Sequence, residues 1–564
     1  MDNSNFVIAV LLSLGILVAF HFLYEKPHQE WVRQQTLLKK TEAAGPVAPP
    51  VPAEPPRARA QILAEGERLS IETPELRGSI RLKGARFDDL DLVNYREKAE
   101  AGSPRIDLLS PAGSSTPHQA YYAEFGWLDG GAPVPDAGTV WRTESKKLTP
   151  DKPAVLTWDN GQGLTFERTV AVDRDYMFTV TDRVKNGGGG TVTLYPFGLI
   201  SRHGKPGTED VYVLHEGPIG VLGGTLKEFK YKDLVKGEKK AEESAGGWLG
   251  FTDKYWLVAL VPSPDENITA TVAFEPAANA APGQGVFQAD FRGTPVSLAP
   301  GAVTERTVRF FAGAKRVSLL DEYRERLGIP LFDRAIDFGW YYYLTKPFLY
   351  LLDYLGGFFG NMGWAIVAFT IMLKLITLPL SMKSYRSMAK LKALQPEMKA
   401  LQERFKDDKQ RQSLEMMELY KRERVNPMSG CFPMLVQIPI FFALYKILYV
   451  GIELRHAPLF GWIRDMSAPD PTSVLTLFGL LDWPFIPHIG VWPVLMGVSM
   501  FVQQKLSPQP VDKTQAQVFL YLPLIFTFMM ANVAVGLIFY WTLSNILGLG
   551  QQWFIMHKAG ERKP

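Results

Sequence analysis

Hydrophobic and polar residues are distributed differently in the two halves of this 564-residue chain. Residues 57–330 contain many short segments rich in β-branched and aromatic residues, with alternation in places and turn residues between them. Such segments are typical of β-strands, and their number predicts an all-β sandwich. Most of the chain after 338 is strongly apolar, in runs that predict membrane-spanning helices.

This pattern predicts a multi-domain membrane protein with a six-span α-helical transmembrane bundle. We divide the chain into an N-terminal signal-anchor span (1–25), a Pro/Ala-rich linker (26–56), the β-sandwich domain (57–330), an interfacial amphipathic helix (331–360), a second span (361–381), a helical hairpin (382–428), four further spans (429–558) and a basic tail (559–564). The first span is interpreted as uncleaved because AFHFLYEK lacks a small-x-small cleavage site.

Charge orients the predicted spans. Between 383 and 424 the chain has twelve Lys or Arg against seven Asp or Glu, and the tail HKAGERKP is also basic. Because basic loops stay on the cytoplasmic side, we expect the hairpin and both termini in the cytoplasm and the β domain outside. Lys446, near the outer end of the third span, is expected to extend its ammonium group to the interface.

The run Met362–Leu380 contains a single charged residue, Lys374. A cation inside a span costs roughly 2.5–3.5 kcal/mol on insertion scales, so Lys374 is a candidate functional residue. The alternative is that its long side chain simply reaches the nearby interface. Thr370 and Thr377 lie four residues before and three after it, on the same helix face, which favours a polar lining.

Other polar residues recur in the later apolar runs. Gln437 is costly in lipid and is expected to face the bundle interior. Two of the spans are short, which predicts local bilayer thinning. We expect a wet cavity, open to the cytoplasm, that is lined by Lys374 and Thr370 and by the polar residues of the later spans. These are Gln437, Gln503, Gln504, Thr527, Asn532, Thr542, Ser544 and Asn545.

The hairpin segment has apolar residues at spacings of three and four, many of them methionine. One interpretation is that this seam only holds the two helices together. The other is that flexible Met side chains offer an adaptable surface to varied apolar partners.

Composition and motifs argue against catalysis. The formal net charge of +3 is nearly balanced, which is not typical of a dedicated nucleic-acid binder, and one cysteine excludes an intrachain disulfide. The apolar region contains no HExxH, no GxSxG and no paired carboxylates within a span, and the histidines lack metal-ligand spacing. We therefore expect no enzyme activity, no cofactor and no metal site.

Particular segments resemble a known family. The stretches MAKLKALQPEMKALQERFKDDKQ and CFPMLVQIPIFFALYKILYV, with YWTLSNILGLGQQW near the end, are similar to the YidC family of membrane protein insertases. The resemblance covers 333–558 closely and the N-terminal anchor and β domain more weakly. It implies a bacterial inner-membrane location, with a periplasmic β-supersandwich.

The resemblance also implies a function and a site. Members insert nascent membrane proteins into the lipid bilayer, alone or with the Sec translocon, and chaperone the folding of larger ones; ribosomes or signal recognition targeting factors would meet the basic hairpin and tail. The family's groove cation corresponds to Lys374, where the best-known relatives carry Arg. The implied substrate-binding residues are Lys374, Thr370, Gln437, Ile438, Pro439, Phe441, Tyr540 and Trp541, of which Trp541 replaces a family tyrosine.

Two other functions fit parts of the pattern. A small-solute transporter could use Lys374 as an anion site, but such a transporter predicts internal repeats and broken helices, which the sequence does not show. The β domain alone could be a carbohydrate-binding module, although no group of residues in 57–330 singles out a sugar pocket.

Overall fold

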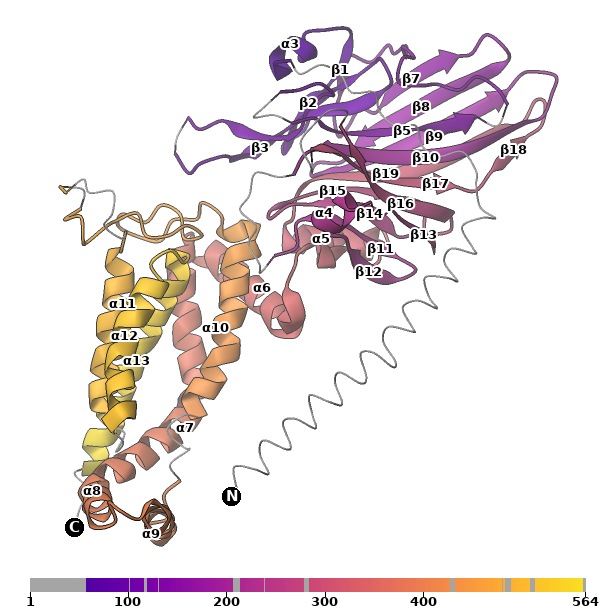
Figure 1. Cartoon of the computed structure of the whole chain (residues 1–564). Coiled ribbons are helices and arrows are strands. Elements are labelled where there is room, and N and C mark those ends of the chain that lie inside the picture. Colours follow the sequence, from indigo (N-terminus) through magenta and orange to yellow (C-terminus); the bar gives the residue numbers. More distant parts are fainter. Residues whose placement is uncertain are drawn as a thin grey trace.

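The computed structural model describes residues 57–560 apart from 101, 116–118, 130, 206–213, 238, 278–283, 427–431, 479, 482–487 and 508–512. Two domains are visible, a β domain and a helical domain (Figure 1). The predicted first span, the linker and the last four residues of the tail lie outside the described residues.

The β domain is a sandwich of two sheets, as the alternating pattern predicted. One has eleven strands, in the order β13-β16-β17-β10-β5-β3-β2-β1-β6 with β18 beside β10 and β4 beside β3; the other has eight, in the order β12-β11-β14-β15-β19-β9-β8-β7. The strands are β1 Arg68–Glu72, β2 Leu76–Arg81, β3 Arg86–Arg96, β4 Arg105–Leu109, β5 Tyr121–Asp129, β6 Lys147–Leu148, β7 Ala154–Asp159, β8 Leu164–Val172, β9 Met177–Asn186, β10 Val192–His203, β11 Gly217–Leu222, β12 Thr225–Glu228, β13 Lys240–Ala245, β14 Trp248–Thr252, β15 Trp256–Val261, β16 Asn267–Pro276, β17 Gly285–Gly293, β18 Val296–Leu298 and β19 Val303–Ala314.

Side-chain alternation explains how these strands pack. In β8 every second residue, from Leu164 to Val172, is buried, as a period of two requires when one face lies against the other sheet. At the centre, Phe87 of the larger sheet contacts Phe310 and Phe178 of the smaller one edge-on, with ring centroids 5.4 and 5.5 Å apart. A single continuous apolar core therefore joins the sheets.

A buried arginine, ion-paired within the smaller sheet, also hydrogen-bonds to the larger sheet. Arg168 of β8 donates to both carboxylate oxygens of Asp182 on β9, at 2.6 and 2.8 Å. Its Nη2 also donates to the backbone carbonyl of Phe125, in the other sheet, at 2.7 Å. Because the Arg168 side chain is only 1 % exposed, its charge depends on these partners.

The helical domain follows the β domain in the chain. Its elements, with the short helices of the β domain, are α3 Arg59–Leu63, α4 Tyr231–Val235, α5 Val317–Arg326, η2 Phe332–Ala335, η3 Gly339–Tyr341, α6 Tyr342–Phe359, α7 Met362–Ala393, α8 Gln395–Arg404, α9 Lys409–Arg422, α10 Phe432–Val450, η5 Ile452–Leu454, α11 Val491–Leu506, α12 Lys513–Met529 and α13 Val535–Gly560.

Helix boundaries differ from the expected ones in two places. The helix of the second span does not end at 381, because α7 continues to Ala393 and contains Pro379 without a break. It ends at its capping residue Leu394, two residues before Pro396, which occupies the first turn of α8 and has no backbone N–H to donate to the carbonyl of Lys392. The segment 331–360 is not one helix either: η2 and η3 precede α6.

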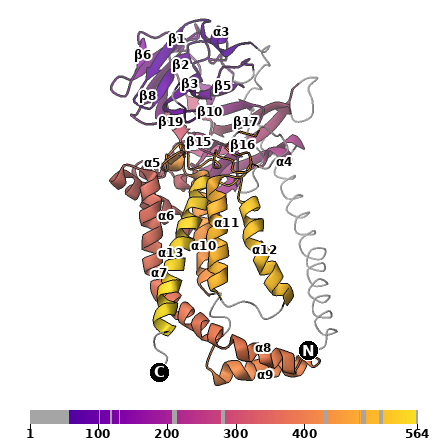
Figure 2. The same ribbon diagram turned by 90° about the vertical axis from the view of Figure 1, so that its left-hand side faces the viewer.

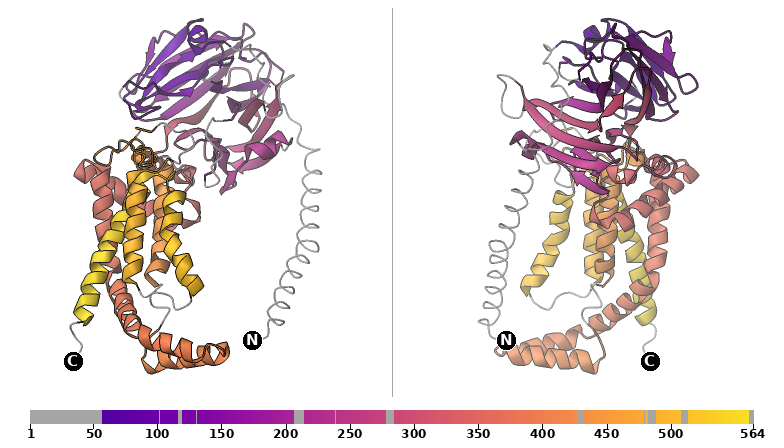
Figure 3. Two further views of the ribbon diagram at one scale, coloured as in Figure 1. Left: turned by 60° about the vertical axis from the view of Figure 1, so that its left-hand side comes forward. Right: turned by 90° about the vertical axis from the view of Figure 1, so that its right-hand side faces the viewer.

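The β domain sits at one end of the helical domain, and α8 and α9 lie at the other end (Figures 1 and 2). Views from further directions show the same order (Figure 3). The α13 helix runs from the β-domain end towards α8 and α9.

Specific contacts join the domains. The guanidinium of Arg455 donates to the backbone carbonyls of Arg96 and Glu97, and the ammonium of Lys254 lies 3.9 Å from the Tyr449 ring centroid. Lys446 does not extend to the interface as expected: its side chain is buried and pairs with Asp337 at 2.9 Å.

The helical domain exposes much apolar surface. Of the described helices, α7 is the one long and apolar enough by composition to cross a membrane, and shorter apolar stretches run over Leu435–Val450 and Ala516–Met529. Large apolar side chains more than a third exposed on the helices include Trp364, Leu375, Ile376, Leu435, Ile438, Leu495, Val498, Val518, Tyr521, Leu524, Ile525, Phe528, Ile546 and Trp553. So large an apolar surface indicates contact with lipid.

Candidate functional site

Lys374 lies in the middle of α7, where α7 packs against α13. Its half-buried side chain extends towards Gly548 of α13. A Cβ atom placed on Gly548 would lie 3.8 Å from Lys374 Nζ, 3.7 Å from Gln503 Nε2 of α11 and 3.6 Å from Tyr385 Oη of α7. Three polar groups from two helices thus surround one glycine of a third.

Lys374 has no counter-charge in the part of the chain that the structure describes. The ion pairs of the described residues do not include it, although most other buried cations, such as Arg168 and Lys346, have carboxylate partners. An unpaired cation in an apolar surrounding is unfavourable, so its presence indicates a role outside structural stabilisation.

The hydroxyls of the two threonines on the same face of α7 donate hydrogen bonds to backbone carbonyls of α7 itself. Thr370 is fully buried, and its hydroxyl donates to the carbonyl of Ile366 at 2.6 Å. The hydroxyl of Thr377 donates to the carbonyl of Leu373 at 2.8 Å. The hydroxyl of Thr370 is therefore satisfied within α7 and enclosed, and its role in lining a wet cavity stays a prediction.

Several other polar residues expected in that cavity are also enclosed. Thr542 and Thr527 are buried and donate to carbonyls four residues earlier in their own helices. Asn545 is buried and donates to the hydroxyl of Ser499 at 3.1 Å, which joins α13 to α11. These groups hold helices together, whereas Gln503 remains half-buried beside Lys374.

Gln437 faces the neighbouring helix α13. Its amide nitrogen donates to the hydroxyl of Tyr540 at 2.5 Å. Tyr540 is only 2 % exposed, and its contact with an entering chain stays a prediction. A hydrogen-bonded pair between two helices is one way in which a polar side chain is accommodated within a membrane.

The remaining expected residues form a more accessible surface. Ile438 of α10 is 42 % exposed, and Phe441, one turn further, is half-buried and contacts Trp541 with ring centroids 4.8 Å apart. Trp541 also contacts Phe526 of α12 at 5.6 Å. Pro439 lies within α10 between Ile438 and Phe441. We call Ile438, Phe441 and Trp541 the apolar strip.

Tyr385 and Gly548 were not predicted from the sequence. Tyr385 is eleven residues after Lys374, close to three full helical turns, so it lies on the same face of α7 and could have been found from this spacing. Its place in the segment assigned to the hairpin concealed it. Gly548 gave no signal, because the feature that matters there is a missing side chain.

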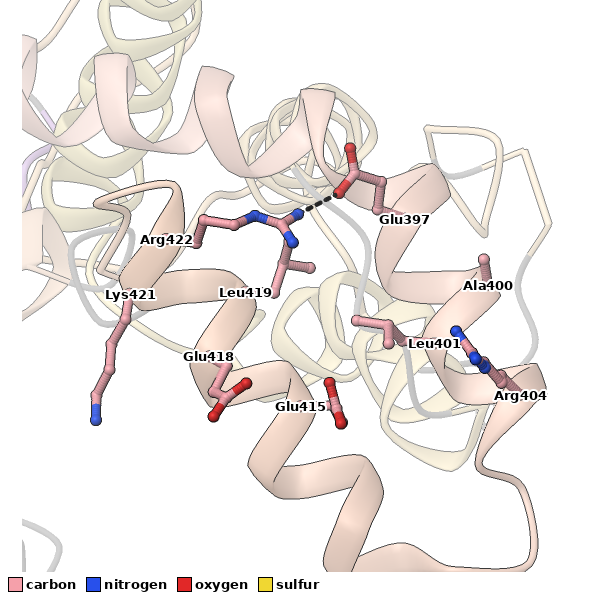
Figure 4. Close-up of a pocket in the computed structure, with 9 residues that line it drawn as sticks. All are labelled: Glu397, Ala400, Leu401, Arg404, Glu415, Glu418, Leu419, Lys421 and Arg422. Atoms are coloured by element: carbon pink, nitrogen blue, oxygen red, sulfur yellow. Dashed lines mark hydrogen bonds and ion pairs between the residues drawn. The ribbon is translucent and has the colours of Figure 1, made fainter.

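A concave surface lies between α8 and α9 (Figure 4). Its volume is about 550 Å³ and its lining is mainly charged: Glu397, Ala400, Leu401, Arg404, Glu415, Glu418, Leu419, Lys421 and Arg422. An ion pair of 3.2 Å between Glu397 and Arg422 connects the two helices, and each helix has one buried apolar residue, Met398 in α8 and Leu419 in α9. By contrast, Leu414 and Met417 are 59 % and 51 % exposed.

Metal chemistry has no candidate among the described residues, where no three His, Cys, Asp or Glu side chains are grouped as possible ligands. The polar centre around Lys374 brings together a cation, an amide and a phenol. This arrangement is suited to binding a negatively charged group.

The fold and these surfaces define a class: a helical membrane protein with a large β-sandwich domain at one end. Comparison with known proteins agrees. The family described as 60Kd inner membrane protein matches residues 354–562, and the family described as YidC periplasmic domain matches residues 68–351.

Individual relatives are similar over nearly the whole chain. The membrane protein insertase YidC of Methylobacterium radiotolerans is 46 % identical over 99 % of this chain and 95 % of its own length, and that of Methylobacterium nodulans is 48 % identical over 99 % and 96 %. A crystal structure of an active YidC insertase is similar over 87 % of this chain and 95 % of that one, with 16 % identity and a TM-score of 0.37. The chain belongs to the YidC family of membrane protein insertases.

Proposed function

We propose that this protein inserts nascent proteins into the bacterial inner membrane through the groove beside Lys374. The observation that carries the proposal is the unpaired ammonium of Lys374 on a helix whose neighbours present exposed apolar side chains. A polar segment of a client would approach Lys374 while the adjoining apolar segment moves along Ile438 and Phe441 into lipid.

Hydrophobic transfer supplies the free energy for this process. Each fully buried large apolar side chain contributes about 1.5–3 kcal/mol, so a span of about twenty residues needs no nucleotide hydrolysis. The protein must lower the free-energy cost of moving the client's polar segment through the apolar interior of the membrane. An uncompensated cation lowers that cost most for segments that contain acidic residues.

The topology that fits this function has six spans, with both termini in the cytoplasm and the β domain in the periplasm. The position of the β domain and of the α8–α9 pair at opposite ends of the helical domain supports this topology (Figure 1). The excess of Lys and Arg between 383 and 424 supports a cytoplasmic location for α8 and α9.

The α8–α9 pair is the proposed contact for ribosomes or signal recognition targeting factors. Exposed Leu414 and Met417 lie beside charged residues of both signs, a combination that suits an adaptable protein contact. Cooperation with the Sec translocon and help in folding larger clients are proposed on family membership alone.

Site-specific photocrosslinking tests the proposal. A photoreactive residue at 438 or 441 should form adducts with short membrane proteins on stalled ribosomes, and fewer when the client span is made polar. A probe at 364 is the matched control, because Trp364 is 55 % exposed on the helical domain but lies at the other end of α7 from the α8–α9 pair. Equal adducts from 364 and 438, or none from 438, would contradict insertion along the apolar strip.

A further inference from the structure

The end of α10 nearest the β domain is held by a charged pair. The ammonium of Lys446 donates to the carboxylate of Asp337, which lies between η2 and η3, at 2.9 Å. The Lys446 side chain is 11 % exposed and that of Asp337 is 20 % exposed. An ion pair at this depth is screened less than a surface pair, and removing one partner leaves a buried charge without compensation. The pair therefore restrains α10 more firmly than an ion pair in water would.

Asp337 is itself held by two backbone groups. Its Oδ2 also accepts from the N–H of His215, in the β domain, at 3.1 Å, and its Oδ1 accepts from the N–H of Gly339 at 2.9 Å. Gly339 has a φ of +64°, which favours glycine, and its Cα faces the Lys446 side chain closely enough that a Cβ there would lie 3.6 Å from Cε. The β domain and a tight turn thus fix the carboxylate that receives Lys446.

A second contact lies one turn away on α10. Phe442 is four residues before Lys446, so the two side chains share one face of the helix. The Phe442 ring is stacked on that of Tyr341, with centroids 6.3 Å apart and an angle of 7° between the planes. Tyr341, at the end of η3, is four residues after Asp337. The segment 337–341 therefore follows one face of α10 and contacts it at two successive turns.

Phe442 connects this segment to the apolar strip. Its ring contacts that of Phe441 edge-on, with centroids 5.8 Å apart, and Phe441 contacts Trp541 of α13 at 4.8 Å. Because Phe441 and Phe442 are carried by the same helix, a rotation of α10 that withdraws Phe442 from Tyr341 also displaces Phe441 from Trp541. Direct contacts thus link the turn at 337–341 to the surface along which a client would move.

Other contacts hold the same end of α10 differently. Lys254 lies 3.9 Å from the Tyr449 ring centroid, and Arg455 donates to two carbonyls of the β domain. These contacts lie at or beyond the last turn, so they fix where the helix ends. Lys446 and Phe442 are held on one face at two successive turns, and two such contacts fix the rotation of a helix about its axis.

We propose that Asp337 is a positioning residue for insertion: through Lys446 it sets the rotation of α10 and so holds Phe441 in the apolar strip. The proposal rests on the proposed function. Asp337 acts at a distance from the client, because Lys446 is eight residues, about 12 Å along the helix axis, from Ile438. The turn between the two domains thereby takes part in guiding clients.

Photocrosslinking with the full-length protein in liposomes tests this proposal. A photoreactive phenylalanine derivative replaces either Phe441 or Phe442, and the measured quantity is the ratio of client adducts from 441 to those from 442. General destabilisation lowers both adducts together and leaves their ratio unchanged, whereas rotation of α10 changes the ratio. The variants are Asp337→Asn, Lys446→Gln and Lys446→Arg, and thermal unfolding of each purified variant reports folding separately.

Lys346→Gln is the matched control. Lys346 is also a lysine whose side chain is 12 % exposed, and it pairs with Asp321 and Asp333 at 2.8 and 2.7 Å. It belongs to α6, however, so its loss weakens the junction between the domains without releasing α10. Lys346→Gln should lower the thermal stability and keep the ratio of 441 to 442 adducts.

The expected result is a changed ratio in the variants that break the pair. Loss of one charged hydrogen bond corresponds to about tenfold in an equilibrium, so Asp337→Asn and Lys446→Gln should each lower the ratio about tenfold. The double variant should lower it no further, because both changes remove the same contact. Lys446→Arg should keep the ratio, since a guanidinium also donates to a carboxylate.

Three results would overturn the proposal: an unchanged ratio in Lys446→Gln, an equal fall in Lys346→Gln and Lys446→Gln, or a ratio as low in Lys446→Arg as in Lys446→Gln. If the proposed function itself is wrong, the unaltered protein will give no client adducts from 441 or 442. That outcome is distinct from adducts whose ratio does not respond to Asp337.

Discussion

Glu453 of η5 accepts a hydrogen bond of 2.9 Å from the backbone N–H of Val317, the first residue of α5. This contact joins the segment that follows α10 to the helix that closes the β domain. The first N–H groups of a helix have no partner within it, so Glu453 takes the place of a capping residue from another part of the chain. Such a contact fixes the two domains in relation to each other.

We predict that this junction is sensitive to pH. Burial raises the pKa of Glu453 to about 7, from 4.5, and nearby Asp353 adds to the shift while Arg316 opposes it. Between those two values the folded protein binds a proton that the unfolded chain does not, so the free energy of unfolding increases as the pH falls. Glu453→Gln keeps an acceptor for Val317 but cannot titrate.

Thermal unfolding of the full-length protein from pH 4.5 to 8 tests this prediction. At pH 8, Glu453→Gln should be more stable than the unaltered protein by about 1–3 kcal/mol. This difference in stability should shrink as the pH falls, because the unaltered protein becomes protonated at Glu453. Glu453→Ala is the control, because it removes both the charge and the acceptor of the Val317 N–H. A pH profile of Glu453→Gln parallel to that of the unaltered protein would contradict the assignment.

Arg168→Met is expected to destabilise the β domain strongly. The substitution leaves the Asp182 carboxylate enclosed without its partner and removes the hydrogen bond to Phe125 in the other sheet. Breaking a buried pair by removing one partner costs about 3–5 kcal/mol. The urea midpoint of the β domain within the full chain, measured by pulse proteolysis, reports this cost.

The double variant Arg168→Met/Asp182→Leu is the matched control. Because it removes both charges, it should recover much of the lost stability. If the double variant is as unstable as Arg168→Met, the cost arises from packing around Trp141, whose ring centroid lies 5.0 Å from the guanidinium, and not from the buried charge.

Local pattern predicted much of this fold from the sequence. Strand β8 was predictable because alternation with a period of two places its residues alternately against the core and outside. The end of α7 was not, since the residues from 382 to 393 are good helix formers whether they continue a span or begin a hairpin. The break at Leu394 depends on Pro396, whose position in a first turn was not recognised.

The site was predictable to the extent that it consists of residues unusual for their surroundings. Lys374 and Gln437 could be identified because charge and amide groups are rare in apolar runs. The burial of Tyr540 and Thr370 could not, since a helix face alone does not show which neighbour covers it. The surroundings of Gly548 consist of three side chains from two other helices, and the sequence pattern of one helix does not show which neighbours will meet it.

The hydrogen bond between Gln437 and Tyr540 should couple α10 to α13. Tyr540→Phe and Gln437→Leu each remove it, and a double-mutant cycle on unfolding in bicelles should give a coupling of about 0.6–1.7 kcal/mol. Because Tyr540 is buried, Tyr540→Phe should not change client adducts from a probe at 438. A coupling near zero would indicate that the two side chains find other partners.

Lys374 should act through its charge and not through a fork-shaped contact. Lys374→Arg keeps the charge, so it should preserve insertion of a client with an acidic tail, whereas Lys374→Met should lower it about tenfold, as expected when one charged hydrogen bond is lost. Lys392→Met is the matched control, because Lys392 is an exposed lysine near the end of the same helix and donates to the Leu506 carbonyl. Protease protection of the client in liposomes measures all three. If Lys374→Met and Lys392→Met insert the client equally well, the charge of Lys374 is not what the client uses.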